Sequence, residues 1–507
     1  MIKSVHGMSI YYILLLFAHI GLIWSLPYVP TQDGPSHIYN LVILHDLLNG
    51  GKEWGEFFVY QLSAIPNLGF TFLAYPLLHF FSPLTVERIF ISLYIIFIGV
   101  SVPFFLKTFN KQPLPVSYFI FPVIFNYTFF MGFYSYIAAV PFFLLSFSLA
   151  WRIRNSSTAC RFLCLNAFGI IIFYVHLIPF IFFLLSLASI TAVESPDYKK
   201  SIKNLLKLLL IISPSILNLL YYLEFSTSSS VSDFSYLLSL SRYIRLFIEL
   251  LYFSTVNFLP WQILPASILM LLIVVAAYHS IKDLVKRRFQ TQNITAAEKT
   301  LIYLSVLLIL IYFFVPFTVG NGRYFNERFP WVILLIILPL LRIPETPFIR
   351  RFGSVLIGSI VGIFFIFNAI ILNQQSSKVQ KFLSGLDIDM PTGARIMMYK
   401  PRPPEWATVD ILLHATSYYG ILKGCVDIGN YEADTDLFPI RFNKTGSTAR
   451  QKYQTIYKAK NINWENYPEI QYLLAWEIDN KEREVLNKHF HIIWEQDEFN
   501  IWQRNAL

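Results

Sequence analysis

Apolar segments long enough to cross a membrane recur along most of this chain. We expect spans near 9–26, 86–106, 113–129, 134–151, 161–176, 177–194, 203–222, 261–281, 300–316, 329–342 and 353–372. Only 14% of the residues are charged, whereas soluble domains carry about 25%. Because about 20 apolar residues cross a bilayer as one helix, the sequence predicts a polytopic α-helical membrane protein with about eleven transmembrane helices, in a range of about 10 to 13.

The character of the sequence changes after residue 372. Residues 373–507 contain no apolar run of membrane length. The segments ARIMMY, IQYLLAWEI and FHIIWEQDEFNIWQR are typical of strands, and VDILLHATSYYGILKG and NKEREVLNKHF are typical of helices, the first of them ended by Gly424. We therefore predict a transmembrane domain over 1–372, with a catalytic first outer loop at 27–85, and a small α/β domain over 373–507.

The basic residues indicate how the chain is oriented. The run 69–82, LGFTFLAYPLLHFF, contains a proline and is short for a span, so we place it at the membrane surface. One side of the membrane then receives about three times as many basic residues in its loops as the other. This predicts a protein of the cytoplasmic (inner) membrane with a cytoplasmic N-terminus and a periplasmic or extracellular C-terminal domain. The scattered basic residues do not indicate a nucleic-acid partner.

The first outer loop contains the stretch TQDGPSHIYN, in which Asp33 precedes a Gly-Pro break. A carboxylate on such a turn can point into a cleft and act as a general base toward a hydroxyl or amine. It can also bind a divalent cation such as Mg²⁺ or Mn²⁺. The alternative is structural, because Asp33 or Ser36 can cap the helix that follows, with Pro35 in its first turn.

Further polar residues fall at the expected outer ends of helices. As candidates for substrate or donor binding we select His37, Tyr39, Asn126, His176, Arg323, Glu327 and Arg328. The two arginines suit a phosphate, although they can also reach the membrane interface or form a surface pair with Glu327. The two histidines are either metal ligands or hydrogen-bonded packing residues.

Two outer segments allow a role in recognition or a structural one. Tyr418, Tyr419 and Tyr431 can stack on a sugar ring or belong to the core of the C-terminal domain. The stretch Arg242–Phe253 has apolar residues at helical spacing. It is expected to form an amphipathic helix on the outer leaflet or to pack against the bundle.

These features together resemble the GT-C superfamily of integral-membrane glycosyltransferases, which includes protein mannosyltransferases and lipid A aminoarabinose transferases. The motifs that carry the resemblance are TQDGPSHIYN with the following LLNGG, IPNLGFTFLAYPLLHFFSPLTVERIFISLYIIFIG, NGRYFNERFPWVILLIILPLL and the C-terminal domain. The sequence departs from the pattern at two places. Gln32 precedes Asp33 where many members have a second acidic residue, and Ile65 precedes Pro66 where a basic residue is common.

The resemblance implies hexosyl or pentosyl transfer from a polyprenyl-phosphate sugar donor to a lipid, glycan or protein acceptor, within glycan biosynthesis at the cell envelope. Asp33 would be the base or a metal-linked carboxylate, and Arg328 or Arg323 would hold the donor phosphate. A single carboxylate fits such a displacement better than it fits a glycosidase, which needs two.

Two other classes of function compete with this one. A transporter or flippase of lipid-linked glycans is expected to carry charged or broken helices in mid-membrane and to have related halves, neither of which is evident. A catalytically inactive relative that acts as an assembly subunit remains the third possibility. Membrane lipids are partners in all three cases.

Overall fold

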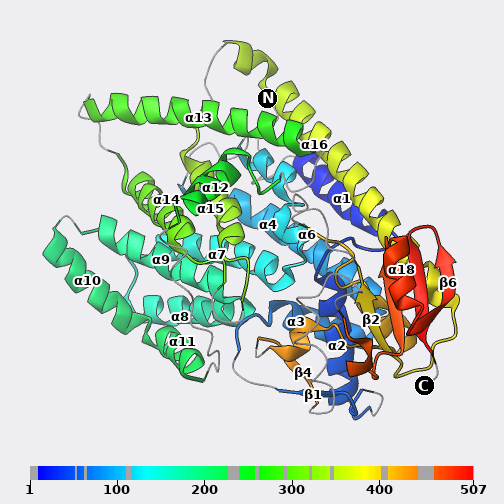
Figure 1. Cartoon of the computed structure of the whole chain (residues 1–507). Coiled ribbons are helices and arrows are strands. Elements are labelled where there is room, and N and C mark those ends of the chain that lie inside the picture. Colours follow the sequence, from blue (N-terminus) through cyan, green and yellow to red (C-terminus); the bar gives the residue numbers. More distant parts are fainter. Residues whose placement is uncertain are drawn as a thin grey trace.

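The computed structural model describes residues 10–51, 54–61, 65–109, 116–195, 197–225, 239–256, 262–289, 294–318, 322–342, 347–400, 409–435, 437–443 and 462–505. These residues form a helical bundle with a smaller α/β domain packed against one end of it (Figure 1). The predicted class, a helical membrane protein followed by an α/β region, is confirmed at this level.

The helices of the bundle follow the apolar segments. The α-helices are α1 (Ile10–Ser25), α2 (Gly34–Leu48), α3 (Gly69–Ala74), α4 (Pro83–Phe109), α6 (Tyr127–Phe130), α7 (Tyr134–Ile153), α8 (Thr158–Val175), α9 (Leu177–Val193), α10 (Tyr198–Ile211), α11 (Ser213–Phe225), α12 (Leu240–Leu251), α13 (Ile263–Phe289), α14 (Ala296–Phe314), α15 (Phe329–Ile337) and α16 (Pro347–Phe382). The 3-10 helices are η1 (Tyr75–His79), η2 (Tyr118–Val123), η5 (Asn326–Arg328), η6 (Leu338–Leu340) and η7 (Leu383–Asp387).

Six of the described helices are long and apolar enough to cross a membrane: α4, α7, α8, α13, α14 and α16. The pair α10 and α11, bent by 73°, makes a seventh if it is one broken span. The helices α1 and α9 and the segment Tyr118–Phe130 are apolar but shorter. Length and composition therefore identify an integral membrane protein, and the predicted number of eleven spans stays a prediction.

Burial separates the centre of the bundle from its edge. In the most apolar part of α7, 72% of the residues are buried inside the protein, against 28% in α13. Apolar side chains left exposed on a spanning helix suit contact with lipid, which is as apolar as they are. We therefore place α7 at the centre, packed against α4, α8 and α9, and α13 at the lipid-facing edge.

The C-terminal domain is built on a five-stranded mixed sheet. Its strands are β2 (Arg395–Tyr399), β3 (Val426–Asp427), β5 (Tyr472–Trp476), β6 (Phe490–Gln496) and β7 (Phe499–Arg504), in the order β3-β2-β5-β7-β6. The strand β2 is parallel to β3 and β5, and the pairs β5/β7 and β7/β6 are antiparallel. The helices are α17 (Ser417–Lys423) and α18 (Asn480–Leu486), with 3-10 turns η8 (Tyr431–Asp434) and η11 (Trp464–Asn466).

The C-terminal domain folds back onto the first loop of the chain. The strand β1 (Phe58–Tyr60) pairs antiparallel with β4 (Ile440–Phe442), and α17 packs against α2. At that contact Gly420 lies on the Tyr39 ring so closely that an added Cβ would come within 2.4 Å of it. In Figure 1 the orange and red segments of the C-terminal domain lie beside the blue α2. The first loop and the C-terminal domain therefore form one structural unit.

Several local predictions can be compared with the structure. The run 69–82 becomes the short helices α3 and η1, too short to span a membrane. The strand segments of the C-terminal domain are confirmed, as is the end of α17 at Gly424, which is left-handed with φ 70°.

The structure differs from the sequence prediction at other places. The segment 409–424 is helical only from Ser417, because residues 411–416 form turns. The helix α16 continues past residue 373 to Phe382. The segment STSSSVSD (226–233) lies outside the described residues.

Candidate active site

Asp33 stands at the start of α2, where backbone contacts hold it against the turn before α7. Its N–H donates to the carbonyl of Met131 at 3.1 Å, and the N–H of Gln32 donates to Phe130 at 2.8 Å. Asp33 occupies the N-cap position of α2, but its side chain makes no capping hydrogen bond. The carboxylate of Asp33 therefore does not cap α2, which was the structural alternative for this residue. The side chain makes other contacts instead.

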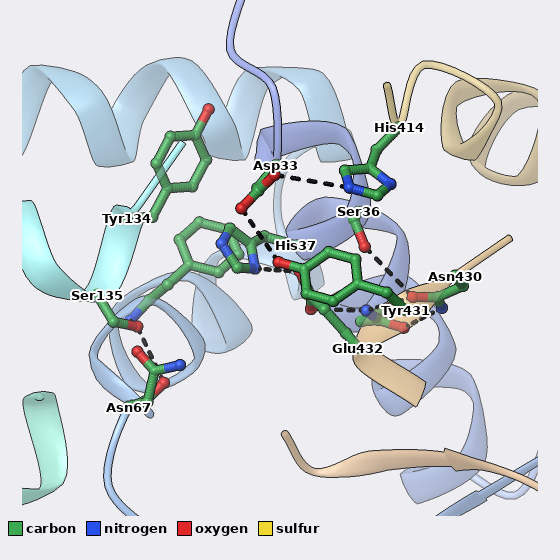
Figure 2. Close-up of polar contacts among 12 residues, drawn as sticks. Asp33, Ser36, His37, Asn67, Tyr134, Ser135, His414, Asn430, Tyr431 and Glu432 are labelled. Carbon is green, nitrogen blue, oxygen red and sulfur yellow. Dashed lines mark hydrogen bonds and ion pairs between the residues drawn. The ribbon is translucent and has the colours of Figure 1, made fainter. Parts of the chain in front are cut away.

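The carboxylate of Asp33 points toward the C-terminal domain (Figure 2). The Tyr431 hydroxyl donates to Oδ2 at 3.1 Å, and the amide of Gln32 donates to Oδ1 at 3.1 Å. His414 Nε2 lies 3.6 Å from Oδ1, and its ring packs on Tyr431 with the ring centroids 4.8 Å apart. Asp33 is thus only 6% exposed, covered by residues nearly four hundred positions away in the chain.

This environment shifts the protonation of Asp33. Burial raises the pKa of the carboxyl from 3.8 to about 6, partly offset by His37 and by hydrogen bonds from Gln32 and Tyr431. A carboxylate with a pKa near 6 is still charged at neutral pH and is a stronger base than an exposed aspartate. The site therefore presents a group suited to removing a proton from a hydroxyl.

A second carboxylate lies next to Asp33 and comes from the C-terminal domain. Glu432 is 1% exposed, its Oε1 lies 2.7 Å from His37 Nδ1, and its Oε2 accepts from the Asn40 amide at 2.7 Å. Burial tends to lower the pKa of His37, but Glu432, Asp33 and a hydrogen bond to the Gly132 backbone outweigh it and raise that pKa. The pair therefore joins α2 to η8 with opposite charges that compensate each other inside the protein.

A third carboxylate, Glu87 at the start of α4, supports the same loop from the side of the bundle. The Tyr134 hydroxyl lies 2.5 Å from Glu87 Oε1 and 2.9 Å from the Thr31 hydroxyl. Glu87 is 1% exposed. Because the loop containing Thr31 is tied in this way to α4 and α7, the bundle itself positions the backbone around Asp33.

Arg328 lies on the bundle side of Asp33, close enough for their charges to interact. Its Nη1 donates to the carbonyls of Arg323 and Tyr324 at 2.6 and 3.0 Å, and its guanidinium lies 4.2 Å from the centroid of the Phe133 ring. Its buried Nε has no hydrogen-bond partner among the described residues. Arg328 therefore holds a buried donor group without a described partner, which is rare in folded proteins.

The other predicted binding residues take different positions. Arg323 is exposed and contributes its backbone carbonyl to Arg328. Glu327 is half-buried, and burial raises its pKa to about 7. His176 caps α9 by accepting from the N–H of Ile178 at 3.1 Å, although it lies near enough to Arg328 for their charges to interact.

Four further candidates serve the packing of the fold in this structure. Asn126 caps α6 by accepting from the N–H groups of Thr128 and Phe129. The hydroxyl of Tyr39 donates to the Cys425 carbonyl at 3.1 Å, at the contact between α2 and the C-terminal domain. Tyr418 and Tyr419 are fully buried. Of the three tyrosines selected in the sequence, Tyr431 is the one that reaches Asp33.

The metal role considered for Asp33 stays a prediction, because the described structure shows no assembled set of ligands around it. Both of its oxygens receive hydrogen-bond donors, from Tyr431 and Gln32, rather than facing further oxygen ligands. Within the described ranges no three His, Cys, Asp or Glu side chains are grouped as a metal site.

Comparison with known proteins adds little to this geometry. No family model and no curated protein matches the chain. Among solved structures, the chain is similar to the crystal structure of ArnT from Cupriavidus metallidurans bound to undecaprenyl phosphate, with 11% identity, a TM-score of 0.41 and coverage of 98% of each chain. At this level of similarity, function must be argued from the site itself.

Proposed function

We propose that this protein is a membrane glycosyltransferase that moves a sugar from a polyprenyl-phosphate donor to an acceptor on the outer face of the membrane. The observation that carries the proposal is the placement of Asp33. It is a buried carboxylate with a raised pKa, next to a membrane bundle, with the Arg328 guanidinium close enough for their charges to interact. A base and a cation in one site suit a displacement that removes a proton and releases a phosphate.

The proposed reaction is a single inverting displacement. Asp33 accepts the proton of the acceptor hydroxyl while the oxygen bonds to the anomeric carbon of the sugar. The bond between that carbon and the phosphate oxygen breaks, and its electron pair leaves with the polyprenyl phosphate. Arg328 stabilises the negative charge of this leaving group. His414 and Tyr431 hold the Asp33 carboxylate in place through the contacts described above.

The direct test uses the full-length protein purified in detergent with radiolabelled polyprenyl-phosphate sugars and a crude acceptor extract. Transfer of label, or slow hydrolysis of the donor, supports the proposal. Donor binding without either reaction favours a flippase or an assembly subunit. The absence of binding by any donor contradicts the proposal.

Arg328→Lys is expected to weaken donor binding by about tenfold or more, because lysine keeps the charge but cannot form the paired hydrogen bonds of a guanidinium with phosphate. Equilibrium binding of labelled polyprenyl phosphate measures this. Arg323→Lys is the matched control, since Arg323 is exposed. The affinity of this variant for labelled polyprenyl phosphate should stay close to that of wild type. Equal affinities for the two variants would remove Arg328 from the donor site.

The transfer rate is expected to depend on pH through Asp33. Since the base works only when charged, the rate should rise about tenfold per pH unit below the pKa and level off above it, with the bend near the Asp33 pKa of about 6. Initial rates at saturating donor across this range measure the profile. A rate that falls as the pH rises through 6 would instead indicate that the protonated form of Asp33 is the active one.

A further inference from the structure

The helix α10 exposes two different rows of side chains. Of its 14 residues only Leu208 is buried, and the helix contacts α8 and α9. Because successive residues of a helix are about 100° apart, four lysines fall on one arc of about 100° and four apolar residues fall on the arc beside it. The basic row is Lys199, Lys200, Lys203 and Lys207, and the apolar row is Tyr198, Ile202, Leu206 and Leu209, all of them exposed.

The start of α10 lies at the end of the bundle opposite the candidate active site. Helix α9 begins after His176, which lies near Arg328, and runs away from it for 17 residues. Beyond the last turn of α9, the Asn204 amide of α10 donates to the Ser195 hydroxyl at 2.8 Å. Figure 1 shows α10 on the side of the bundle remote from α18. The basic row is therefore far from the proposed chemistry.

The basic row lies level with the end of the bundle, where a membrane surface is expected. Three of its lysines precede Asn204, which marks that end. The helix then enters the bundle, where the carbonyl of Ile211 accepts from Asn166, midway along α8, at 2.8 Å. Lys207 lies about 4.5 Å beyond Asn204, and its side chain points back toward the start of the helix. All four ammonium groups can therefore reach the membrane surface.

The charge of the basic row is not compensated within the described part of the protein. No ion pair or side-chain hydrogen bond joins these four ammonium groups to another described residue. Of the two acids nearest in the chain, Glu194 pairs with Arg154 at 3.3 Å. Asp197 caps α10 by accepting from the N–H of Lys199 at 3.2 Å. Anions that balance the remaining charge have to come from outside the described residues.

We propose that α10 binds anionic phospholipids, whose phosphates contact the basic row while their acyl chains cover the apolar row. Four or more basic residues on an amphipathic helix are typical of anionic-lipid recognition. A soluble acidic protein would satisfy only the basic row and leave the apolar row in water. Because only Leu208 of α10 is buried, the lipid also supplies contacts that the protein does not. This binding is independent of sugar transfer and makes the order of α10 depend on membrane charge.

Native mass spectrometry of the full-length protein in detergent tests the binding with two added lipids, phosphatidylglycerol and phosphatidylcholine. Wild type should bind the anionic phosphatidylglycerol about tenfold more tightly or better, since each lysine near the headgroups favours it. Lys203→Gln combined with Lys207→Gln should reduce this preference to about threefold or less. Lys203→Arg combined with Lys207→Arg keeps the charge and should keep the preference.

The matched control removes two lysines elsewhere. Lys481→Gln combined with Lys488→Gln makes the same change of charge at exposed positions of the C-terminal domain, and its lipid preference should equal that of wild type. Equal affinity of wild type for the two lipids overturns the proposal. A full preference that persists in the Lys203→Gln and Lys207→Gln protein overturns it as well, because the lipid then binds elsewhere.

Two further measurements locate the contact and identify the occupant. In lipid nanodiscs, the amides of α10 should exchange with deuterium several-fold more slowly in phosphatidylglycerol than in phosphatidylcholine, whereas those of α18 should not change. Equal exchange of α10 in the two lipids contradicts the proposal. A polyglutamate peptide that binds more tightly than phosphatidylglycerol, and loses that affinity in the Lys203→Gln and Lys207→Gln protein, would assign the basic row to an acidic protein instead.

Discussion

Asp33→Asn is expected to lower sugar transfer by about a hundredfold to ten-thousandfold, the usual contribution of a general base. Asparagine has nearly the same shape as aspartate, and its oxygen can still accept the hydrogen bond that Tyr431 donates to Asp33. The substitution therefore removes charge and basicity while leaving most packing in place. Donor binding should remain, because Arg328 and the bundle are unchanged.

The measurement compares initial transfer rates and donor affinities for wild type and Asp33→Asn. Asp46→Asn is the matched control, since it makes the same change on the same helix α2 but away from Tyr431 and His414. Transfer at the wild-type rate by Asp33→Asn would show that another group is the base. A similar loss in Asp46→Asn would point to a general effect of charge on α2.

Gly132→Ala is expected to destabilise the protein and to displace Asp33. Gly132 has φ 74°, and an added Cβ would lie 2.6 Å from the Gly34 nitrogen and 2.8 Å from the Asp33 nitrogen. The left-handed backbone alone costs about 1–2 kcal/mol for a residue with a side chain, and forced contacts in a packed interior cost about 1–3 kcal/mol more. Because the clashing atoms are backbone, the loop that presents Asp33 has to move.

Thermal unfolding in detergent, followed by tryptophan fluorescence, measures the stability, and the transfer assay measures the site. We expect a lower unfolding temperature together with a large loss of transfer. Gly21→Ala is the control, because Gly21 lies in α1 with no neighbouring atom within 4 Å of an added Cβ. An alanine there should be neutral or slightly stabilising. Wild-type behaviour of Gly132→Ala would mean that this close approach does not position Asp33.

The local elements of this fold are readable in the sequence because they depend on neighbouring residues. Apolar runs of helical length predict the bundle, since a bilayer demands internally hydrogen-bonded helices. A short apolar run bounded by polar residues, as in IQYLLAWEI, predicts strands such as β5, which is buried at every position, and the turn glycine Gly424 ends α17 as expected. The first loop was likewise recognisable, because a lone Asp beside a Gly-Pro break is conspicuous between apolar segments.

The composition of the site depends on contacts that no local pattern contains. The sequence indicates one carboxylate, Asp33, followed by His37, with Gln32 at the position where a second acidic residue is expected. The structure brings in Glu432 and His414 from the C-terminal domain and Glu87 from the start of α4. The only local signal for Glu432 was a polar cluster, NYEADTD, within a segment already expected to influence specificity.

What the sequence determined by itself is therefore the class of the protein, most of its helices and strands, and Asp33 as the residue to test. The tertiary structure decided which distant groups surround that residue, that its carboxylate does not cap α2, and that Asn126 and His176 cap helices. The physical reason is the range of the interactions. Helices, turns and caps form between residues a few positions apart, whereas the burial and pKa of Asp33 arise only when the C-terminal domain folds over it.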